Sequence, residues 1–314
     1  MKPSLRIVAI LICLVLVLVA TSRPGAEPKY SEWVAATNLG PVVNSSFFEL
    51  SPAVSKDGLS LYFTSDRPGG YGNLDIWVSH RATEDDAWGV PANLGPVINS
   101  AISDNATALS RDGHWLFFAR NPSGFGQIDI WASWREHTDD DFHWGPPFNL
   151  GAGVNSVFAE GTPSFLENDE GYAPQLFFFS TRPGIGLADI YVSELQSNGV
   201  FGPAAIVPEL SGPARDISPS VRFDGLEIFF HSDRPGSVGN DLWVSTRNSA
   251  FDAWSAPQNL GSTVNTAFSD QQPHIAADRE TLYFASDRPG GIGLIDLYVT
   301  TRAKDKHQIA FGRW

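Results

Sequence analysis

Five segments share one hydrophobic pattern, in which two short runs rich in Phe, Tyr, Trp, Ile and Val flank a turn containing Pro and Gly. Such runs suit a half-buried pleated surface, and Pro and Gly favour tight reversals. Each segment therefore predicts a β-hairpin. The five segments are Leu59–Arg81, Trp115–Arg135, Leu176–Glu194, Glu227–Arg247 and Leu282–Arg302.

Two further strands complete each repeat. A short strand of small and apolar residues precedes every hairpin, as in Ser51–Gly58, and in three of the five copies it ends in Asp-Gly, a strong hairpin turn signal. An NLG-x-x-VN[ST] segment follows most hairpins, as in Trp88–Ser100. The repeats recur every 52 to 60 residues, a period typical of propeller blades. The sequence predicts an all-β fold, a single five-bladed propeller of four-stranded blades over residues 33–302.

The two ends of the repeat region are complementary. Trp33–Ser45 matches the segment that follows other hairpins but has no hairpin before it, whereas the last hairpin has no such segment after it. A strand from the start of the chain would therefore complete the last blade and remove an exposed edge.

The N-terminus carries a predicted export signal. Lys2 and Arg6 precede an apolar run, Ile7–Ala20, which is long enough for a secretory signal and short for a membrane span. We expect residues 1–22 to be a cleavable signal peptide and 23–32 a linker, with 303–314 a C-terminal tail. The mature protein would be periplasmic or secreted, without a membrane span; retention of the signal as an anchor is the alternative.

Composition narrows the set of partners. The net charge of −14 makes nucleic acid an unsuitable ligand, because an acidic surface repels phosphate backbones. The single Cys lies in the predicted signal, so the mature chain forms no disulfide. We expect a monomer whose partner is a protein segment or a glycan. No cofactor is predicted, apart from a possible structural cation such as calcium in the axial channel.

The blade sequence P-x-x-S-x-D-G-x-x-L-Y-F-x-S-D-R-P-G-G-x-G-x-x-D-I-W-V-S, from Pro52 to Ser79, resembles the bacterial WD-like, TolB-type β-propeller repeat family. The resemblance covers all five units. It implies a propeller architecture and exported relatives, and says little about function because such repeats have many different partners.

One carboxylate per blade falls where an outer strand hands over to the next inner strand. These residues are Glu49, Asp104, Glu160, Asp216 and Asp270. Five acids around one mouth could bind a ligand or a cation. Alternatively each is paired with an Arg near the Pro-Gly turn and joins the blades. The candidate partners are Arg67, Arg120, Arg182, Arg234 and Arg288.

A second recurring acid opens the last strand of each hairpin. An Asp that closes a Gly-rich turn usually accepts hydrogen bonds from local backbone amides, so we expect a structural role. These residues are Asp75, Asp129, Asp189, Asp241 and Asp296. His231 and His274 break the repeat pattern near the axis and are candidate ligand-binding residues. The segment Arg135–Trp144 contains several His and Asp, but its position favours a solvated charged loop.

No motif of nucleophilic, phosphate-binding or metalloprotease chemistry is present. The leading hypothesis is a non-catalytic binding or scaffold module that recognises a protein segment or glycan at the acidic mouth. The alternative is a glycoside-acting enzyme, since five-bladed propellers also host such enzymes. A third possibility is a purely structural ring centred on a cation.

Overall fold

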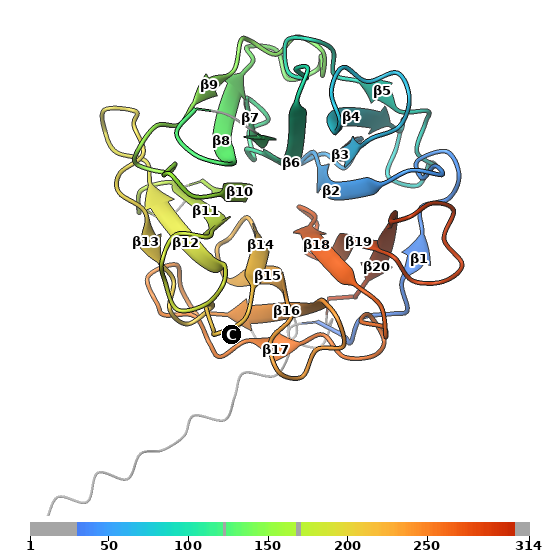
Figure 1. The fold of residues 1–314 in the computed structure, drawn as a ribbon. Helices are drawn as coiled ribbons and strands as arrows, with labels where there is room; N and C mark the ends of the chain where they lie inside the picture. The colour runs from blue at the N-terminus through green and yellow to red at the C-terminus, as the bar shows by residue number, and fades with distance from the viewer. Residues whose placement is uncertain (1–29, 122–123, 168–170, 305–314) are drawn as a thin grey trace, which may run out of the picture.

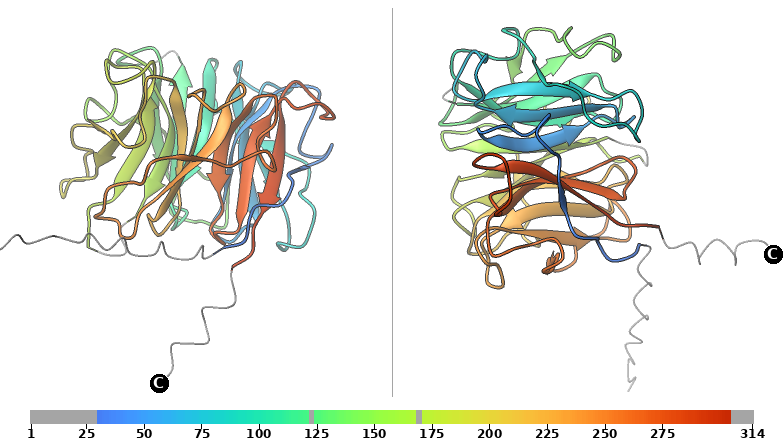
Figure 2. Two further views of the ribbon diagram at one scale, coloured as in Figure 1. Left: turned by 90° about the horizontal axis from the view of Figure 1, so that it is seen from below. Right: turned by 90° about the vertical axis from the view of Figure 1, so that its right-hand side faces the viewer.

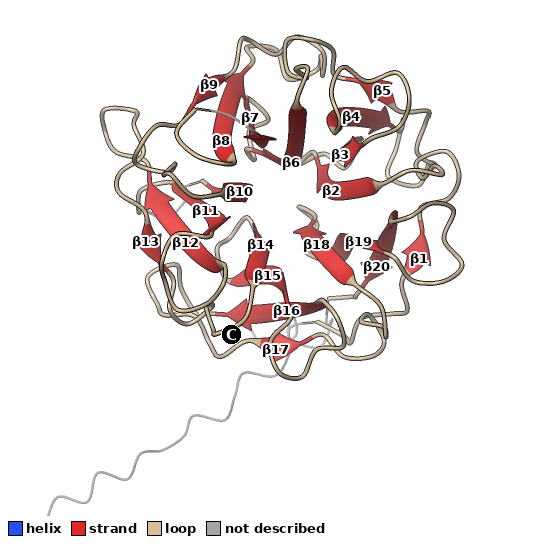
Figure 3. Ribbon diagram, viewed as in Figure 1, coloured by secondary structure: helices blue, strands red, loops and turns tan. Residues whose placement is uncertain are grey.

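The computed structural model describes residues 30–121, 124–167 and 171–304. These parts form five four-stranded antiparallel sheets arranged around a central axis (Figure 1). The described residues contain strands and loops without a helix (Figure 3), so there is also no helix there that could span a membrane. The prediction of an all-β, five-bladed propeller is confirmed. The predicted signal peptide and almost all of the predicted tail lie outside the described residues.

The first four blades each use strands that are consecutive in the chain. Blade one contains β2 (Glu49–Val54), β3 (Ser60–Ser65), β4 (Asp75–His80) and β5 (Ala92–Asn93). Blade two contains β6 (Ser103–Leu109), β7 (Trp115–Asn121), β8 (Asp129–Trp134) and β9 (Phe148–Asn149). Blade three contains β10 (Glu160–Leu166), β11 (Gln175–Ser180), β12 (Asp189–Glu194) and β13 (Ala205–Ile206). Blade four contains β14 (Asp216–Val221), β15 (Glu227–Ser232), β16 (Asp241–Thr246) and β17 (Gln258–Asn259).

The fifth blade joins the two ends of the described chain. It contains β18 (Asp270–Ile275), β19 (Thr281–Ser286) and β20 (Asp296–Thr301), and its outer strand is β1 (Thr37–Asn38). Thr37 lies opposite Val299 and Asn38 opposite Tyr298. The Asn44 side chain prolongs this pairing, since its Oδ1 accepts a hydrogen bond from the Leu297 amide (2.8 Å) and its Nδ2 donates to the Leu297 carbonyl (3.0 Å).

Every inner strand contains a bulge beside the axis. The pairing register shifts at this point in all five blades, for example between Leu50 and Ala53. One residue at each bulge has a left-handed backbone conformation, with φ between 44° and 57°; these are Ser51, Ala106, Thr162, Ser218 and Gln272. A bulge bends a strand and re-aims its side chains, and here it shapes the channel wall. Figure 2 shows the ring from the side, with loops on both faces of the disc.

Aromatic side chains fill the space between neighbouring blades. Trp144 packs on Tyr62 with ring centroids 6.4 Å apart, Trp254 on Phe177 at 6.3 Å, and Trp33 on Phe229 at 5.9 Å. In each pair the Trp comes from one blade and its partner from the preceding one. Edge-to-face contacts of this kind stabilise the interface beyond the apolar area they bury. The recurring Trp residues are therefore packing residues.

Candidate functional site

The five carboxylates predicted to surround a mouth are buried. Each carboxylate has no exposed surface and is paired with an Arg of its own blade. The pairs are Glu49–Arg67 (2.8 Å), Asp104–Arg120 (2.5 Å), Glu160–Arg182 (3.1 Å), Asp270–Arg288 (2.5 Å) and Asp216–Arg234. The second oxygen is also used, as where Glu49 Oε2 accepts from the Ser45 amide at 2.8 Å. In this state the acids present no face to a ligand.

The Arg partners reach across to the preceding blade. Arg67 Nη2 donates to the Val43 carbonyl at 2.6 Å, in the segment that completes blade five. Its guanidinium also lies over the ring of Trp77, 5.4 Å from the centroid. The equivalent Arg side chains donate to Ile98, Val154, Leu210 and Val264. Each acid–Arg pair is therefore a connector between adjacent blades.

The second series of acids caps the hairpin turns. Asp75 accepts from the Tyr71 amide, from the Gly72 amide at 2.9 Å and from Asn93 Nδ2 at 3.0 Å. Asp129, Asp189, Asp241 and Asp296 likewise accept from turn amides of their own blades. Burial raises the pKa of Asp241. These contacts are those of a local structural role.

His231 and His274 are hydrogen-bond acceptors between blades. His231 Nδ1 accepts from the Gln272 amide at 3.2 Å, and His274 Nε2 accepts from the Val54 amide at 3.0 Å. Burial lowers the pKa of both imidazoles to about 4, so both are neutral at pH 7. These bonds go to backbone amides rather than to the five acids.

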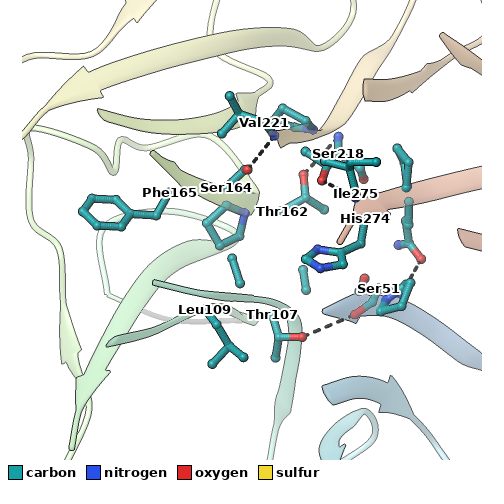
Figure 4. Close-up of a pocket in the computed structure, with 18 of the residues that line it drawn as sticks. Ser51, Thr107, Leu109, Thr162, Ser164, Phe165, Ser218, Val221, His274 and Ile275 are labelled. Carbon is teal, nitrogen blue, oxygen red and sulfur yellow. Dashed lines mark hydrogen bonds between the residues drawn. The ribbon is translucent and has the colours of Figure 1, made fainter. Parts of the chain in front are cut away.

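The axial channel is narrow and has no carboxylate among the described residues of its wall. Hydroxyl, proline and amide side chains line it together with His274, as Figure 4 shows for Ser51, Thr107, Ser218 and His274. Its cavity of about 40 Å³ has room for one or two water molecules. In the described part of the chain, no group of three or more His, Cys, Asp or Glu could hold a metal ion. The axial cation stays a prediction.

A second repeated device, on the opposite side of the blades from the acid–Arg pairs, was missed at the sequence level. The Arg that follows the third strand stacks on the Trp that begins the next segment. Arg81 lies 4.3 Å from the ring centroid of Trp88, Arg135 4.3 Å from Trp144, Arg247 4.1 Å from Trp254, and Arg302 4.6 Å from Trp33. The signal was present, because four of the five hairpin copies end in Arg and a Trp follows three of them after seven or nine residues, while Trp33 supplies the fourth.

Two of these Arg side chains bind a buried carboxylate. Arg302 forms a fork on Glu227, with Nη1 to Oε1 at 2.9 Å and Nη2 to Oε2 at 2.5 Å. Arg135 pairs with Asp141 at 2.5 Å. The first pair joins blades four and five, whereas the second lies within blade two and contacts blade one through Asp141. A planar guanidinium suits such forked pairing.

Asp141 is the centre of a clasp between blades one and two. Its carboxylate accepts from Ser60 Oγ (2.6 Å), Tyr62 Oη (2.5 Å), Arg135 and His80 (2.7 Å). Burial alone would raise the pKa of Asp141, but these hydrogen bonds hold it below its usual value. The interpretation of 135–144 as a solvated charged loop holds for Glu136–Asp139, which are exposed, but is wrong for Asp141, which is only 7% exposed.

Blade three departs from the repeat and produces an apolar groove. Leu195 and Phe201 stand where the other blades have Arg and Trp. With Trp115 and Phe148 of blade two they line a groove of about 340 Å³, and Phe148 is 48% exposed. Trp115 and Trp134 have no Trp at the equivalent positions of the other blades. Trp134 stacks on His114 with a centroid separation of 5.9 Å.

A polar cleft of about 340 Å³ lies between blades five and one. Buried Trp88 and Tyr283 are among its lining residues, together with two cations, Lys56 and Arg81. Three carboxylates line it as well, those of Glu84, Asp86 and Asp278. Burial raises the pKa of Tyr283, an effect that Arg81 opposes and Asp278 and Glu84 increase. This is the cleft in which acids, cations and aromatic residues meet, and the sequence analysis did not single it out.

The comparisons with known proteins correct the assigned family. No protein-family model matches the sequence, and no curated protein matches it. Several of the solved structures that match are glycoside hydrolases. An α-L-arabinofuranosidase from Podospora anserina, solved with cellotriose, matches with a TM-score of 0.57 and 11% identity, over 88% of this chain and 98% of that one. The assignment to the TolB-type family is therefore wrong.

Two further enzymes have the same likeness. An α-L-arabinofuranosidase from Lactobacillus brevis matches with a TM-score of 0.58 and 14% identity, over 84% of this chain and 92% of that one. A Bacillus subtilis arabinanase matches with a TM-score of 0.56 and 13% identity, over 84% and 96%.

These findings also overturn the leading hypothesis of a non-catalytic module that docks its ligand on an acidic mouth. The acids of that mouth are buried and paired, and the matching structures are enzymes rather than scaffolds. At 10 to 14% identity the likeness concerns the fold. This chain shares the fold of the arabinofuranosidase and arabinanase propellers.

Proposed function

We propose that the protein is a glycoside-acting enzyme whose active site is the cleft between blades five and one. The single observation that carries the proposal is the presence of Glu84 and Asp86 in one cleft with cations and aromatic residues. Glycosidases generally use two carboxyl groups that flank the scissile bond, one as acid and the other as base or nucleophile. A volume of about 340 Å³ lies within the usual range of ligand sites.

Glu84 and Asp86 have unlike surroundings, as the two roles require. Asp86 accepts a hydrogen bond from Thr83 Oγ1 at 2.8 Å. The Glu84 side chain instead folds over Gly58, whose backbone carbonyl binds Arg81 Nε at 2.7 Å. Asp278 is committed to the turn before β19, where it accepts from the Glu280 and Thr281 amides and from Thr281 Oγ1. We therefore assign the pair of catalytic roles to Glu84 and Asp86.

The fold supports the same proposal, because the matching solved structures act on arabinose-containing glycosides according to their descriptions. The axial position is a poorer candidate in this chain, since its cavity of about 40 Å³ has no carboxylate among its described lining residues. Export from the cytoplasm, predicted from residues 1–22, would bring such an enzyme to extracellular polysaccharides.

The test is hydrolysis of a panel of aryl α-L-arabinofuranosides, aryl β-D-xylosides, arabinan and arabinoxylan by the purified protein. Glu84→Gln and Asp86→Asn should each lower kcat by roughly 10²- to 10⁴-fold, the usual contribution of a catalytic acid or base. Asp85→Asn is the matched control, because Asp85 is exposed in the same loop and does not line the cleft. Equal turnover by all four proteins, or no turnover of any glycoside, would refute the proposal.

A further inference from the structure

The interface between blades four and five contains a ready-made carboxylate site. Glu227 is the first residue of β15, and its side chain reaches Arg302 of the next blade through two hydrogen bonds and also accepts one from Arg222 of its own blade at 2.6 Å. Arg302 is oriented by its stacking on Trp33 and by the bond from its Nε to the Arg279 carbonyl (3.1 Å). The fold thus shows how a carboxylate is bound at this position of a blade interface.

The interface between blades five and one repeats the Arg–Trp stack but has neither the carboxylate nor a counterpart of Arg222, whose place is taken by Ala276, and Arg81 Nη1 donates to the Glu84 carbonyl at 2.7 Å. Arg81 stacks on Trp88, and its Nε donates to the Gly58 carbonyl at 2.7 Å. The first residue of β19, in the place of Glu227, is Thr281. The register supports this equivalence, since Glu227 lies opposite Thr246 and Thr281 opposite Thr301. Within the described residues, Arg81 forms no ion pair.

Thr281 and Arg81 both line the cleft of about 340 Å³ between blades five and one. Arg247, between blades three and four, also lacks an acid, but its Nη2 is enclosed by protein. Arg135 also lines a cavity, but it is paired with Asp141, so within the described residues Arg81 is the guanidinium of this series that lines a cavity without a carboxylate partner.

We propose that a carboxylate of the ligand binds Arg81 in the way that Glu227 binds Arg302. This inference rests on the proposed function for the nature of the ligand. A carboxylate on a glycan means that the ligand contains a uronic acid. Lys56 lines the same cleft and provides a second cation. Glu84, Asp86 and Asp278 are also there and disfavour a polyanion, so the expected substrate has one uronic acid next to neutral sugars.

The experiment compares binding of glucuronic acid-substituted xylotriose and unsubstituted xylotriose by calorimetry. The wild-type protein should bind the acidic sugar at least 10-fold more tightly, and the difference should shrink as salt is raised. Arg81→Gln should remove the difference. Thr281→Glu should also remove it while leaving the thermal midpoint unchanged or higher, because the new carboxylate takes the place of the ligand's carboxylate.

Thr281→Gln is the matched control, of the same length without the charge, and should keep most of the preference. Equal affinity of the wild-type protein for both sugars would overturn the inference, as would an equally strong block by Thr281→Gln. Hydrolysis is measured separately. Preferential binding of the acidic sugar without turnover of either sugar would contradict the proposed enzyme and support the carboxylate site. Turnover without that preference would support the enzyme and contradict the carboxylate site.

Discussion

Titratable side chains near the axis connect neighbouring blades, some as hydrogen-bond acceptors and others through pairs with Arg. His231 and His274 are buried acceptors, whereas the five acids of the Glu49 series are paired with Arg. The sequence alone identified the two histidines as departures from the repeat and the five acids as recurrent. It left their roles open, because the solvent exposure of each side chain depends on how neighbouring blades pack over it. The five acids therefore looked like a possible binding surface until their burial was known.

The two histidines should make the protein sensitive to acid. Their folded pKa of about 4 lies below the unfolded value of about 6.5, so the stability they contribute is complete above pH 6.5 and is lost as pH falls towards 4. Each histidine accounts for up to about 3 kcal/mol of that loss. Asp233 and Arg215 act on His231, and Asp278 on His274, with smaller effects than burial.

Urea unfolding at pH 7 and pH 4.5 measures this effect. The His231→Gln/His274→Gln variant should lose less free energy of unfolding between the two pH values than the wild-type protein. His137→Gln is the control, because His137 is exposed. An identical pH dependence for the wild-type and double-variant proteins would contradict the expectation.

At the scale of elements, the hairpins and their order could be predicted because each strand carries its own aromatic pattern. The loops could not. Arg135–Trp144 has the composition of a solvated segment, yet Asp141 turns inward to bind Ser60 and Tyr62 of another blade. The cleft between blades five and one was missed because its residues come from both ends of the chain and meet only when the ring closes.

The clasp in this loop allows a sharp comparison of two adjacent residues. Asp141→Ala leaves Arg135 buried without its partner and should lower the free energy of unfolding by about 3–5 kcal/mol. Asp140→Ala removes an exposed pairing with His143 and a hydrogen bond from the Phe142 amide (2.9 Å), and should lower the free energy of unfolding far less than Asp141→Ala. Equal losses in urea titrations would show that Asp141 does not hold the two blades together.

At the scale of the whole molecule, four Asn side chains extend the short outer strands of their blades. Asn44, Asn99, Asn155 and Asn265 each exchange two hydrogen bonds with the backbone of a third strand. In blade three Ser211 takes this place, with longer bonds of 3.2 and 3.5 Å to Ile190. Asn44 differs from the others because it bonds to a residue 253 positions away.

Asn44→Ala should therefore loosen the ring where its ends meet. Loss of two buried hydrogen bonds should cost about 2 kcal/mol and speed amide exchange at Leu39 and Leu297 by roughly 10-fold or more. Asn155→Ala removes the same two kinds of bond inside blade two, whose four strands are consecutive in the chain. It should leave amide exchange at Leu39 and Leu297 unchanged. Hydrogen-exchange mass spectrometry measures both variants, and an equal increase of exchange at these two residues in Asn44→Ala and Asn155→Ala would contradict the expectation.

The seam between blades two and three, where Leu195 and Phe201 replace the Arg–Trp pair, has a thermal consequence. Apolar burial stabilises less as temperature falls, whereas charged connectors respond to acid and salt. Low temperature and low pH should thus open the ring at different places: chilling between blades two and three, and acid on either side of blade five, where His231 and His274 bond to the backbone of the next blade.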